Sequence, residues 1–182
     1  SECLVGSEMC IRDSLDTDRL NQAFYDLQMH HSMLRAVVTE DGMQKVADYP
    51  YAKDIKIYDF SQGNAKEHLE QMRRQYSHRL LNIYEGEVIA LQVTLLPHDS
   101  ARIHFDIDLL IADVTSFQII LRDLVHLYNG GSLESDGHKF NFAAYLKKEE
   151  KLSKEKSDED KKYWENRLKT MPGKPELPVK NT

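Results

Sequence analysis

The feature that most constrains this chain is the stretch from Arg102 to Gly131, which reads as a buried strand, a tight acidic turn and an amphipathic helix. Apolar residues alternate along its first part, as in a strand, and recur at helical spacing from Val114 to Tyr128. An Asn-Gly-Gly sequence follows, which is typical of a helix C-terminus. Because Asp108 and Asp113 flank the turn, this turn is the first candidate for a functional site.

Composition narrows the classes of function. Hydrophobic residues make up 41% and charged residues 30% of the 182 positions, which is ordinary for a globular domain or one lobe of a larger one. The net charge of −6 argues against nucleic acid as a partner, and no apolar run reaches the roughly 20 residues that span a membrane. Both cysteines, Cys3 and Cys10, lie near the N-terminus, so we expect no disulfide framework, no cysteine metal site and a cytoplasmic location.

The two ends of the chain differ from its middle. Residues 1–14 have neither a helical nor a strand period, and we predict that they form a non-native or disordered tail outside the folded part. Residues 15–171 carry the periodic segments and are predicted to form one lobe. Residues 172–182 are rich in proline and are predicted to be extended.

The middle of the chain predicts an α/β (α+β) fold with a mixed, largely antiparallel sheet and packed helices. Asp16 is a suitable N-cap for the first helix, and Asp41-Gly42 is a hairpin turn signal. The strands from Val88 to Leu96 and from Arg102 to Leu109 are separated by a short turn and are predicted to pair antiparallel. The other predicted strands are Met33–Thr39, Gln44–Ala47 and Ile55–Phe60, and the other predicted helices are Leu15–His31, Ala65–Ile83 and Phe140–Leu152. The charged run Lys151–Asp160 is predicted to be a solvated helix face, and the apolar residues of Asp160–Leu168 are predicted to pack that helix onto the body.

Strand alternation places three ionisable residues, His104, Asp106 and Asp108, on the same face of the strand before the turn. Buried carboxyl groups must be paired, hydrogen-bonded or protonated. For Asp108 the plain interpretation is therefore a salt bridge with Arg102 or Arg122.

The other two polar residues of the turn also have plain interpretations. Asp113 is placed to be the N-cap of the following helix, and Ser116 can be an ordinary helix-start hydroxyl. Their spacing with Asp108 favours a site instead, and Asp108, Asp113 and Ser116 are our candidate catalytic residues.

The remaining histidines are weaker candidates. His30 and His31 form a pair, but His31 falls on the apolar stripe of its helix, so a packing or capping role is predicted. The other histidines are scattered, and we expect neither a metal site nor a directly bound cofactor. The chain also has no glycine-rich phosphate loop and no G-x-S-x-G nucleophile elbow.

The turn resembles a known motif. The sequence from Asp108 to Ser116, DLLIADVTS, matches the D-x4-D-x2-S pattern of the heterocyclization domains of nonribosomal peptide synthetases, which are variants of the condensation domain. The resemblance extends to HFDIDLLIADVTSFQIILRDLVHLYNG around the motif, to HHSMLRAVV and DGMQ upstream, and to DKKYWENRL and PELPV downstream. It covers Leu15 to Val179.

This resemblance implies a chloramphenicol-acetyltransferase-like fold of two lobes with a tunnel between them, of which this chain is the N-terminal lobe. It implies substrates carried on the phosphopantetheine arms of upstream and downstream peptidyl carrier proteins, beside an adenylation domain. The implied reaction condenses an acyl or peptidyl thioester with carrier-bound cysteine, serine or threonine. Cyclodehydration to a thiazoline or oxazoline then follows, as in siderophore biosynthesis.

The resemblance also implies roles. Asp108 stands in the place of the first histidine of the condensation motif H-H-x3-D-G, and Asp113 matches the aspartate that both branches share, which holds the loop. The residues thought to serve cyclodehydration belong to the second lobe, so an isolated first lobe is expected to be inactive. Two alternatives are an ordinary condensation or acyltransferase domain that makes an amide or ester without a ring, and a non-catalytic lobe that docks carrier proteins.

Overall fold

The structure is a computed structural model that describes residues 3–11, 15–76, 78–134 and 141–174. The chain divides into two compact units, Ser1–Ser135 and Asp136–Thr182. In the part of the chain that is described, no helix is long and apolar enough to cross a lipid bilayer. The predicted extended segment 172–182 lies mostly outside the described residues.

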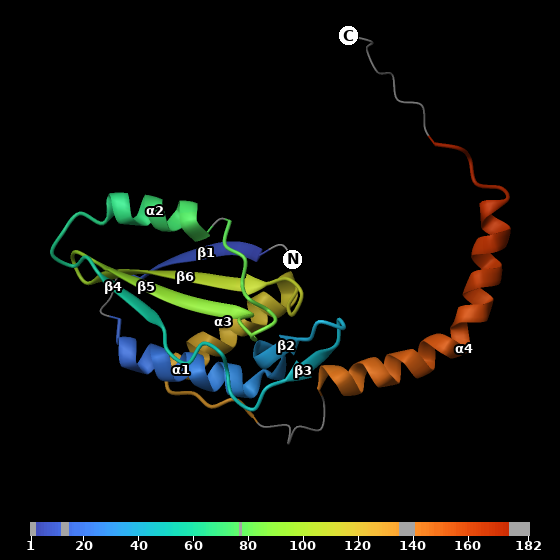
Figure 1. The fold of residues 1–182 in the computed structure, drawn as a ribbon, viewed down its shortest axis with the longest axis horizontal. Helices are drawn as coiled ribbons and strands as arrows, with labels where there is room; N and C mark the ends of the chain where they lie inside the picture. Colours follow the sequence, from blue (N-terminus) through green and yellow to red (C-terminus); the bar gives the residue numbers. More distant parts are fainter. Residues whose placement is uncertain (1–2, 12–14, 77, 135–140, 175–182) are drawn as a thin grey trace, which may run out of the picture. The chain divides into compact units, whose positions relative to one another are not determined.

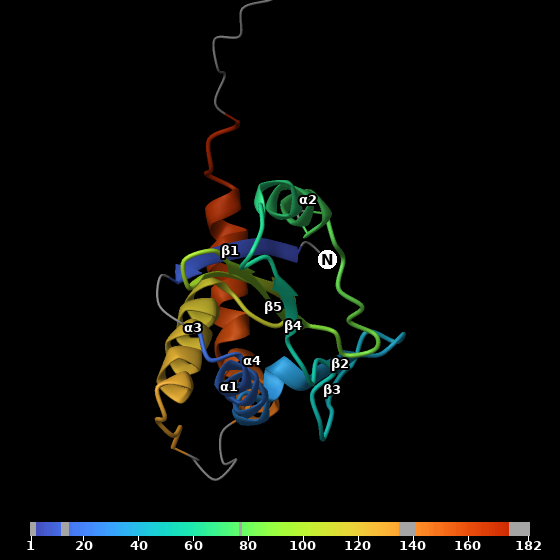
Figure 2. The ribbon, with the colours of Figure 1, turned by 90° about the vertical axis from the view of Figure 1, so that its left-hand side faces the viewer.

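The first unit is built on a mixed four-stranded sheet with the strand order β1-β6-β5-β4. Strand β6 runs antiparallel to both of its neighbours, whereas β4 runs parallel to β5. Helices α1 and α3 cover one face of the sheet and α2 covers the other (Figures 1 and 2). The bounds are β1 Cys3–Ile11, α1 Thr17–His30, β4 Lys56–Asp59, α2 Lys66–Tyr76, β5 Ile89–Leu96, β6 Ser100–Asp108 and α3 Val114–Tyr128. The predicted mixed, largely antiparallel α/β architecture is confirmed.

The hydrophobic core lies between the sheet and the pair α1 and α3. Phe24 of α1 and Phe105 of β6 are almost fully buried there, and Phe105 meets Phe117 of α3 edge to face at 5.4 Å between ring centroids. The strand pairing sets this face, because Phe105 lies opposite Leu91 and Ile107 lies opposite Ile89 in the antiparallel ladder. Helix α3 is thus fixed to the strand that precedes it, which holds the turn between them at both ends.

A two-stranded sheet forms beside the end of α1. After the short 3-10 helix η1 (Ser32–Arg35), strand β2 (Ala36–Val38) pairs antiparallel with β3 (Gln44–Val46). Gly42 has a φ of 78°, which glycine adopts without strain, so the predicted hairpin turn is confirmed.

The first segment departs from the prediction. Cys3–Ile11 forms strand β1 and pairs antiparallel along β6, so the prediction of a disordered tail is wrong for these residues. Its sequence lacks strand alternation, and its partner lies about a hundred residues away, so local periodicity gives no signal for it. That the segment is non-native stays a prediction.

Helix α2 is shorter than predicted. It ends at Tyr76 rather than at Ile83, and Leu80, which the helical pattern places on the inner stripe, is 71% exposed. The chain beyond the helix is held instead by polar contacts to the sheet, which begin at Arg79. The apolar periodicity predicts a longer helix because it carries no information on these contacts between distant parts of the chain.

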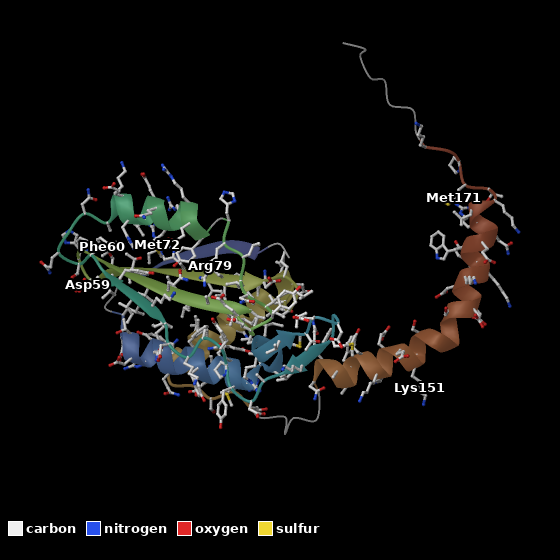
Figure 3. All side chains as sticks on the ribbon, in the orientation of Figure 1. Asp59, Phe60, Met72, Arg79, Lys151 and Met171 are labelled. Atoms are coloured by element: carbon white, nitrogen blue, oxygen red, sulfur yellow. The ribbon has the colours of Figure 1, made fainter. Side chains whose placement is uncertain are left out.

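The second unit contains one long helix, α4, from Phe142 to Leu168. The predicted helix at Phe140–Leu152 and the predicted solvated helix face at Lys151–Asp160 are parts of this one helix, and no glycine or proline interrupts it. Asn141 is its N-cap and accepts from the Ala144 N–H at 2.9 Å. The described side chains of α4 are exposed (Figure 3).

Candidate active site

Asp108 ends strand β6 and is only 1% exposed. Its backbone N–H donates to the Val88 carbonyl at 3.0 Å, and its own carbonyl accepts from the Ile111 N–H at 3.1 Å. Its Oδ1 accepts from the Leu110 N–H at 2.9 Å, which closes the tight turn. Its Oδ2 is buried and, among the described residues, has no hydrogen-bond partner. Asp108 therefore combines a fixed backbone with a carboxyl oxygen that is free to accept.

The predicted salt bridge of Asp108 is not what the structure shows. Arg122 pairs instead with its neighbour Asp123, at 2.8 Å between Nη2 and Oδ1. Arg102 stands six residues earlier on the same strand, a separation of about 20 Å along an extended backbone. The hydrogen bond from Leu110 takes the place of an arginine.

Asp113 begins α3 as its N-cap, as the sequence predicts. Its backbone is extended, with a φ of −94°, and its Oδ1 accepts from the Ser116 N–H at 2.7 Å. The Ser116 side chain, and after it the Ser116 backbone N–H, lowers the pKa of the Asp113 carboxyl below its ordinary value. The capping contact itself uses the backbone N–H of Ser116, which any residue except proline supplies, and a catalytic role for the Ser116 hydroxyl stays a prediction.

The structure therefore brings Asp113 and Ser116 together and places Asp108 apart from them. Asp113 is exposed at the start of α3, whereas Asp108 is buried at the end of β6. Buried Ile111 and Ala112 hold the turn between the two aspartates in the core. The two aspartates present different groups: a charged exposed cap and a buried carboxyl.

The face of the sheet that carries Asp108 is polar, as strand alternation predicts. His104 and Asp106 are buried on it, and the Thr94 hydroxyl lies 3.4 Å from His104 Nε2. Gln92 Nε2 donates to Asp106 Oδ2 at 3.5 Å. Burial raises the pKa of the Asp106 carboxyl, and the Arg79 guanidinium partly offsets this rise.

Sequence reasoning missed the residues that complete this polar face. Gln92 and Thr94 are polar residues in an otherwise apolar strand, and the pairing of Gln92 opposite His104 places Gln92 beside Asp106. That interruption was a usable signal. Arg79 and Glu87 form an ion pair over the same face, and no sequence signal indicated that pair.

His31 and His126 make structural contacts. His31 is the C-cap residue of α1, and its Nε2 lies 2.9 Å from Asp123 Oδ2 of α3, which confirms the predicted packing or capping role. His126 Nε2 lies 3.2 Å from the Ser132 carbonyl oxygen. Within the described ranges, no group of three or more histidine, cysteine, aspartate or glutamate residues is arranged to hold a metal ion. His138 lies outside these ranges.

A family model for the condensation domain matches residues 1–182. The chain belongs to the condensation-domain family. The phenyloxazoline synthase MbtB of Mycobacterium sp. (strain MCS) is 33% identical over 168 residues, which are 91% of this chain and 14% of that protein. The pyochelin synthetase PchE of Pseudomonas aeruginosa (strain UCBPP-PA14) is 28% identical over 180 residues, 97% of this chain and 12% of that protein.

A solved structure shares the fold. The cyclization-docking bidomain of the nonribosomal peptide synthetase EpoB from Sorangium cellulosum superposes with a TM-score of 0.83 and 27% identity, over 98% of this chain and 36% of that one. The chain thus spans about a third of this structure and about an eighth of the curated relatives.

Proposed function

We propose that this chain is the N-terminal lobe of a heterocyclization domain in a nonribosomal peptide synthetase. The similarity to a phenyloxazoline synthase and to a cyclization domain supports this function over condensation without ring closure. The partners are the peptidyl carrier proteins on either side, which present substrates on phosphopantetheine arms, and an adjoining adenylation domain. A second lobe from outside the chain completes the tunnel.

The reaction has two steps. The amine of carrier-bound cysteine, serine or threonine attacks the upstream thioester carbonyl, a C–N bond forms, the C–S bond breaks, and the proton lost by the amine balances the released thiolate. The side-chain thiol or hydroxyl then attacks the new amide carbonyl, and loss of water leaves the C=N bond of the ring. Holding both tethered substrates in place supplies much of the rate.

The observation that carries the assignment of a role to Asp108 is its buried Oδ2 at the end of β6, which has no hydrogen-bond partner among the described residues. An acceptor without a donor in a buried place is costly unless a partner arrives, and the incoming amine is such a partner. We assign Asp108 to the binding and orientation of that amine. Asp113 holds the turn by capping α3, and Ser116 contributes the N–H that completes the cap.

The test uses the intact synthetase that carries this chain, loaded with cysteine on its downstream carrier protein. Mass spectrometry of the carrier-bound products separates the ring from the open amide, because the ring has lost a water. The wild-type protein should form the ring. Accumulation of the open amide alone, with both carriers loaded, would show an ordinary condensation domain.

Substitution in the same assay tests the site. Asp108→Ala and Asp113→Ala should each impair condensation and cyclization, because one removes the amine acceptor and the other loosens the turn. Asp26→Ala, a change at an exposed aspartate of α1, is the matched control and should leave both steps intact. Wild-type yields from both site variants would sink the assignment of these residues.

A further inference from the structure

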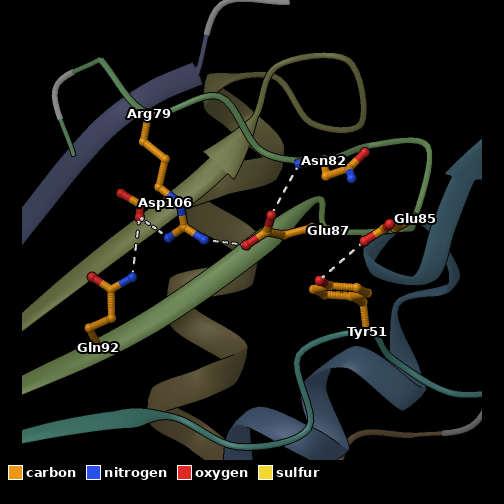
Figure 4. Close-up of polar contacts among 7 residues, drawn as sticks. All are labelled: Tyr51, Arg79, Asn82, Glu85, Glu87, Gln92 and Asp106. Carbon is orange, nitrogen blue, oxygen red and sulfur yellow. Dashed lines mark hydrogen bonds and ion pairs between the residues drawn. The ribbon is translucent and has the colours of Figure 1, made fainter. Parts of the chain in front are cut away.

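The strongest feature that the proposed function leaves unused is an arginine held between two carboxyl groups. Arg79 Nη2 forms an ion pair with Glu87 Oε1, and Arg79 Nη1 lies 3.6 Å from Asp106 Oδ2 (Figure 4). The exposed fractions of the three side chains are 22% for Arg79, 16% for Glu87 and 2% for Asp106. The guanidinium also lies over the Tyr76 ring, 5.4 Å from its centroid.

Such a cluster is a poor way to gain stability. Removing ions from water costs several kcal/mol each, and apolar side chains of similar size often stabilise a fold as well. What an ion cluster does provide is a defined position for the backbone segments that carry it. This points to positioning as the function of the Arg79 cluster.

The segment that the cluster holds is the connection between α2 and β5. Glu87 accepts from the Asn82 N–H at 3.1 Å through Oε2, and its own N–H donates to the Asn82 carbonyl at 3.0 Å. Gly86 in this loop has a φ of 90°, and a Cβ at that position would lie 3.0 Å from Val37 Cγ2. The loop is therefore closed on itself at Glu87 and packed closely against β2.

This loop leads directly to the candidate site. Val88 follows Glu87, is fully buried, and accepts the backbone N–H of Asp108 at 3.0 Å. On the other side of the guanidinium, Asp106 precedes Asp108 by two residues and shares its face of β6. Arg79 thus reaches the backbone of Asp108 by two routes, through Glu87 and Val88 and through Asp106.

We propose that Arg79 is a positioning residue, which with Glu87 fixes the start of β5 against the end of β6 and so sets where the free Oδ2 of Asp108 points. This inference rests on the proposed function, because it requires that Asp108 acts on the substrate. It adds a residue that lies outside the D-x4-D-x2-S motif and touches no substrate itself.

The test compares Arg79→Gln, Arg79→Lys and Glu87→Gln with the wild type in the intact synthetase. The matched control is Arg19→Gln, because Arg19 also pairs with a carboxylate, Asp16 at 3.3 Å, and also lies over a tyrosine ring, but far from the turn. The readouts are kcat for product formation and KM for the downstream carrier protein loaded with cysteine.

Displacement of Asp108 by a fraction of an ångström to an ångström should lower kcat on the order of tenfold to a hundredfold in Arg79→Gln, with KM unchanged. Glu87→Gln should follow in the same direction, Arg79→Lys should recover part of the rate, and Arg19→Gln should match the wild type. A rise in KM with unchanged kcat, or wild-type kcat in Arg79→Gln, would overturn the inference.

A second measurement keeps the test informative if a variant is poorly stable. Amide hydrogen exchange of Asp108 reports directly on its bond to Val88, and in Arg79→Gln it should speed up on the order of tenfold while amides of α1 keep their protection. Equal exchange at Asp108 in both proteins would also overturn the inference. If the proposed function is wrong, the wild-type synthetase itself forms no ring. That result differs from every outcome that would overturn only the role of Arg79.

Discussion

The contact between α1 and α3 offers the sharpest test of how the turn is supported. His31 at the end of α1 meets Asp123 of α3 at 2.9 Å, and their side chains are 25% and 8% exposed. A hydrogen bond to a charged group contributes about 1.5–3 kcal/mol, and partial exposure of His31 favours the lower end. In a double-mutant cycle of His31→Ala and Asp123→Ala, we therefore expect a coupling free energy of about 1–2 kcal/mol.

The same pair predicts a pH dependence with a definite sign. Burial lowers the pKa of His31 below its ordinary value of 6.5, although the hydrogen bond to Asp123 acts in the opposite direction. The folded state therefore binds a proton less readily than the unfolded state. The contribution of the neutral His31 side chain to stability is therefore fully present above pH 6.5 and is lost as the pH falls through the lowered pKa. Removal of Asp123 lowers that pKa further and deepens the loss.

The assay is urea unfolding of the 182-residue chain at several pH values, followed by circular dichroism. Asp123→Asn is the control, because the amide oxygen still accepts from the ring N–H but carries no charge. A coupling free energy near zero would refute the reasoning. The unfolding free energy of the wild type should fall between neutral and mildly acidic pH, and that of His31→Ala should fall less. The same pH dependence in both proteins would also refute the reasoning.

Three further predictions concern the sheet and the turn. Phe105→Ala should cost about 3–5 kcal/mol in unfolding free energy, because the ring is buried against Phe117, and urea unfolding measures this loss. Asp106→Asn should flatten the dependence of the unfolding free energy on pH, because burial raises the pKa of Asp106. The contribution of the protonated Asp106 carboxyl to stability is full below its ordinary pKa of 3.8 and is lost as the pH rises through the raised value. Asp113→Asn should keep the cap to Ser116 and the thermal midpoint, whereas Asp113→Ala should lower the midpoint, and equal midpoints would contradict the capping role.

Elements with strong local signals could be predicted from the sequence. The hairpin of β5 and β6, helix α3 with its cap at Asp113, and helix α1 with its cap at Asp16 all follow from periodicity, turn chemistry and capping. These elements build the turn, so the place of the candidate site was also predictable.

What could not be predicted depends on contacts between distant parts of the chain. Strand β1 pairs with β6 across about a hundred residues, and β4 pairs parallel with β5 without any local sign of that direction. Helix α2 ends before Arg79, and the partners of Arg79, Glu87 and Asp106, lie further along the chain, where helical periodicity gives no sign of them. The contacts of Asp108 could not be predicted for a similar reason: Arg122 pairs with Asp123, and Asp108 accepts from the Leu110 N–H.

The side of the turn on which each aspartate lies was partly predictable. Strand alternation correctly placed Asp108 with Asp106 and His104 on a separate face from Phe105. That this face is buried rather than exposed follows only from the packing of α2 and of the segment after it. Residues such as Gln92, polar within an apolar strand, are the signal of a buried polar face of this kind.

The most direct measurement of the central claim is the rate of product formation by Asp108→Asn in the intact synthetase. Asparagine keeps the Oδ1 that accepts from Leu110 and so keeps the turn, but its amide nitrogen replaces the free acceptor with a donor. We predict a loss on the order of a hundredfold in kcat with unchanged stability, since one preorganised hydrogen-bonding group is removed. Wild-type kcat in Asp108→Asn would contradict the role of Asp108 as the acceptor for the incoming amine.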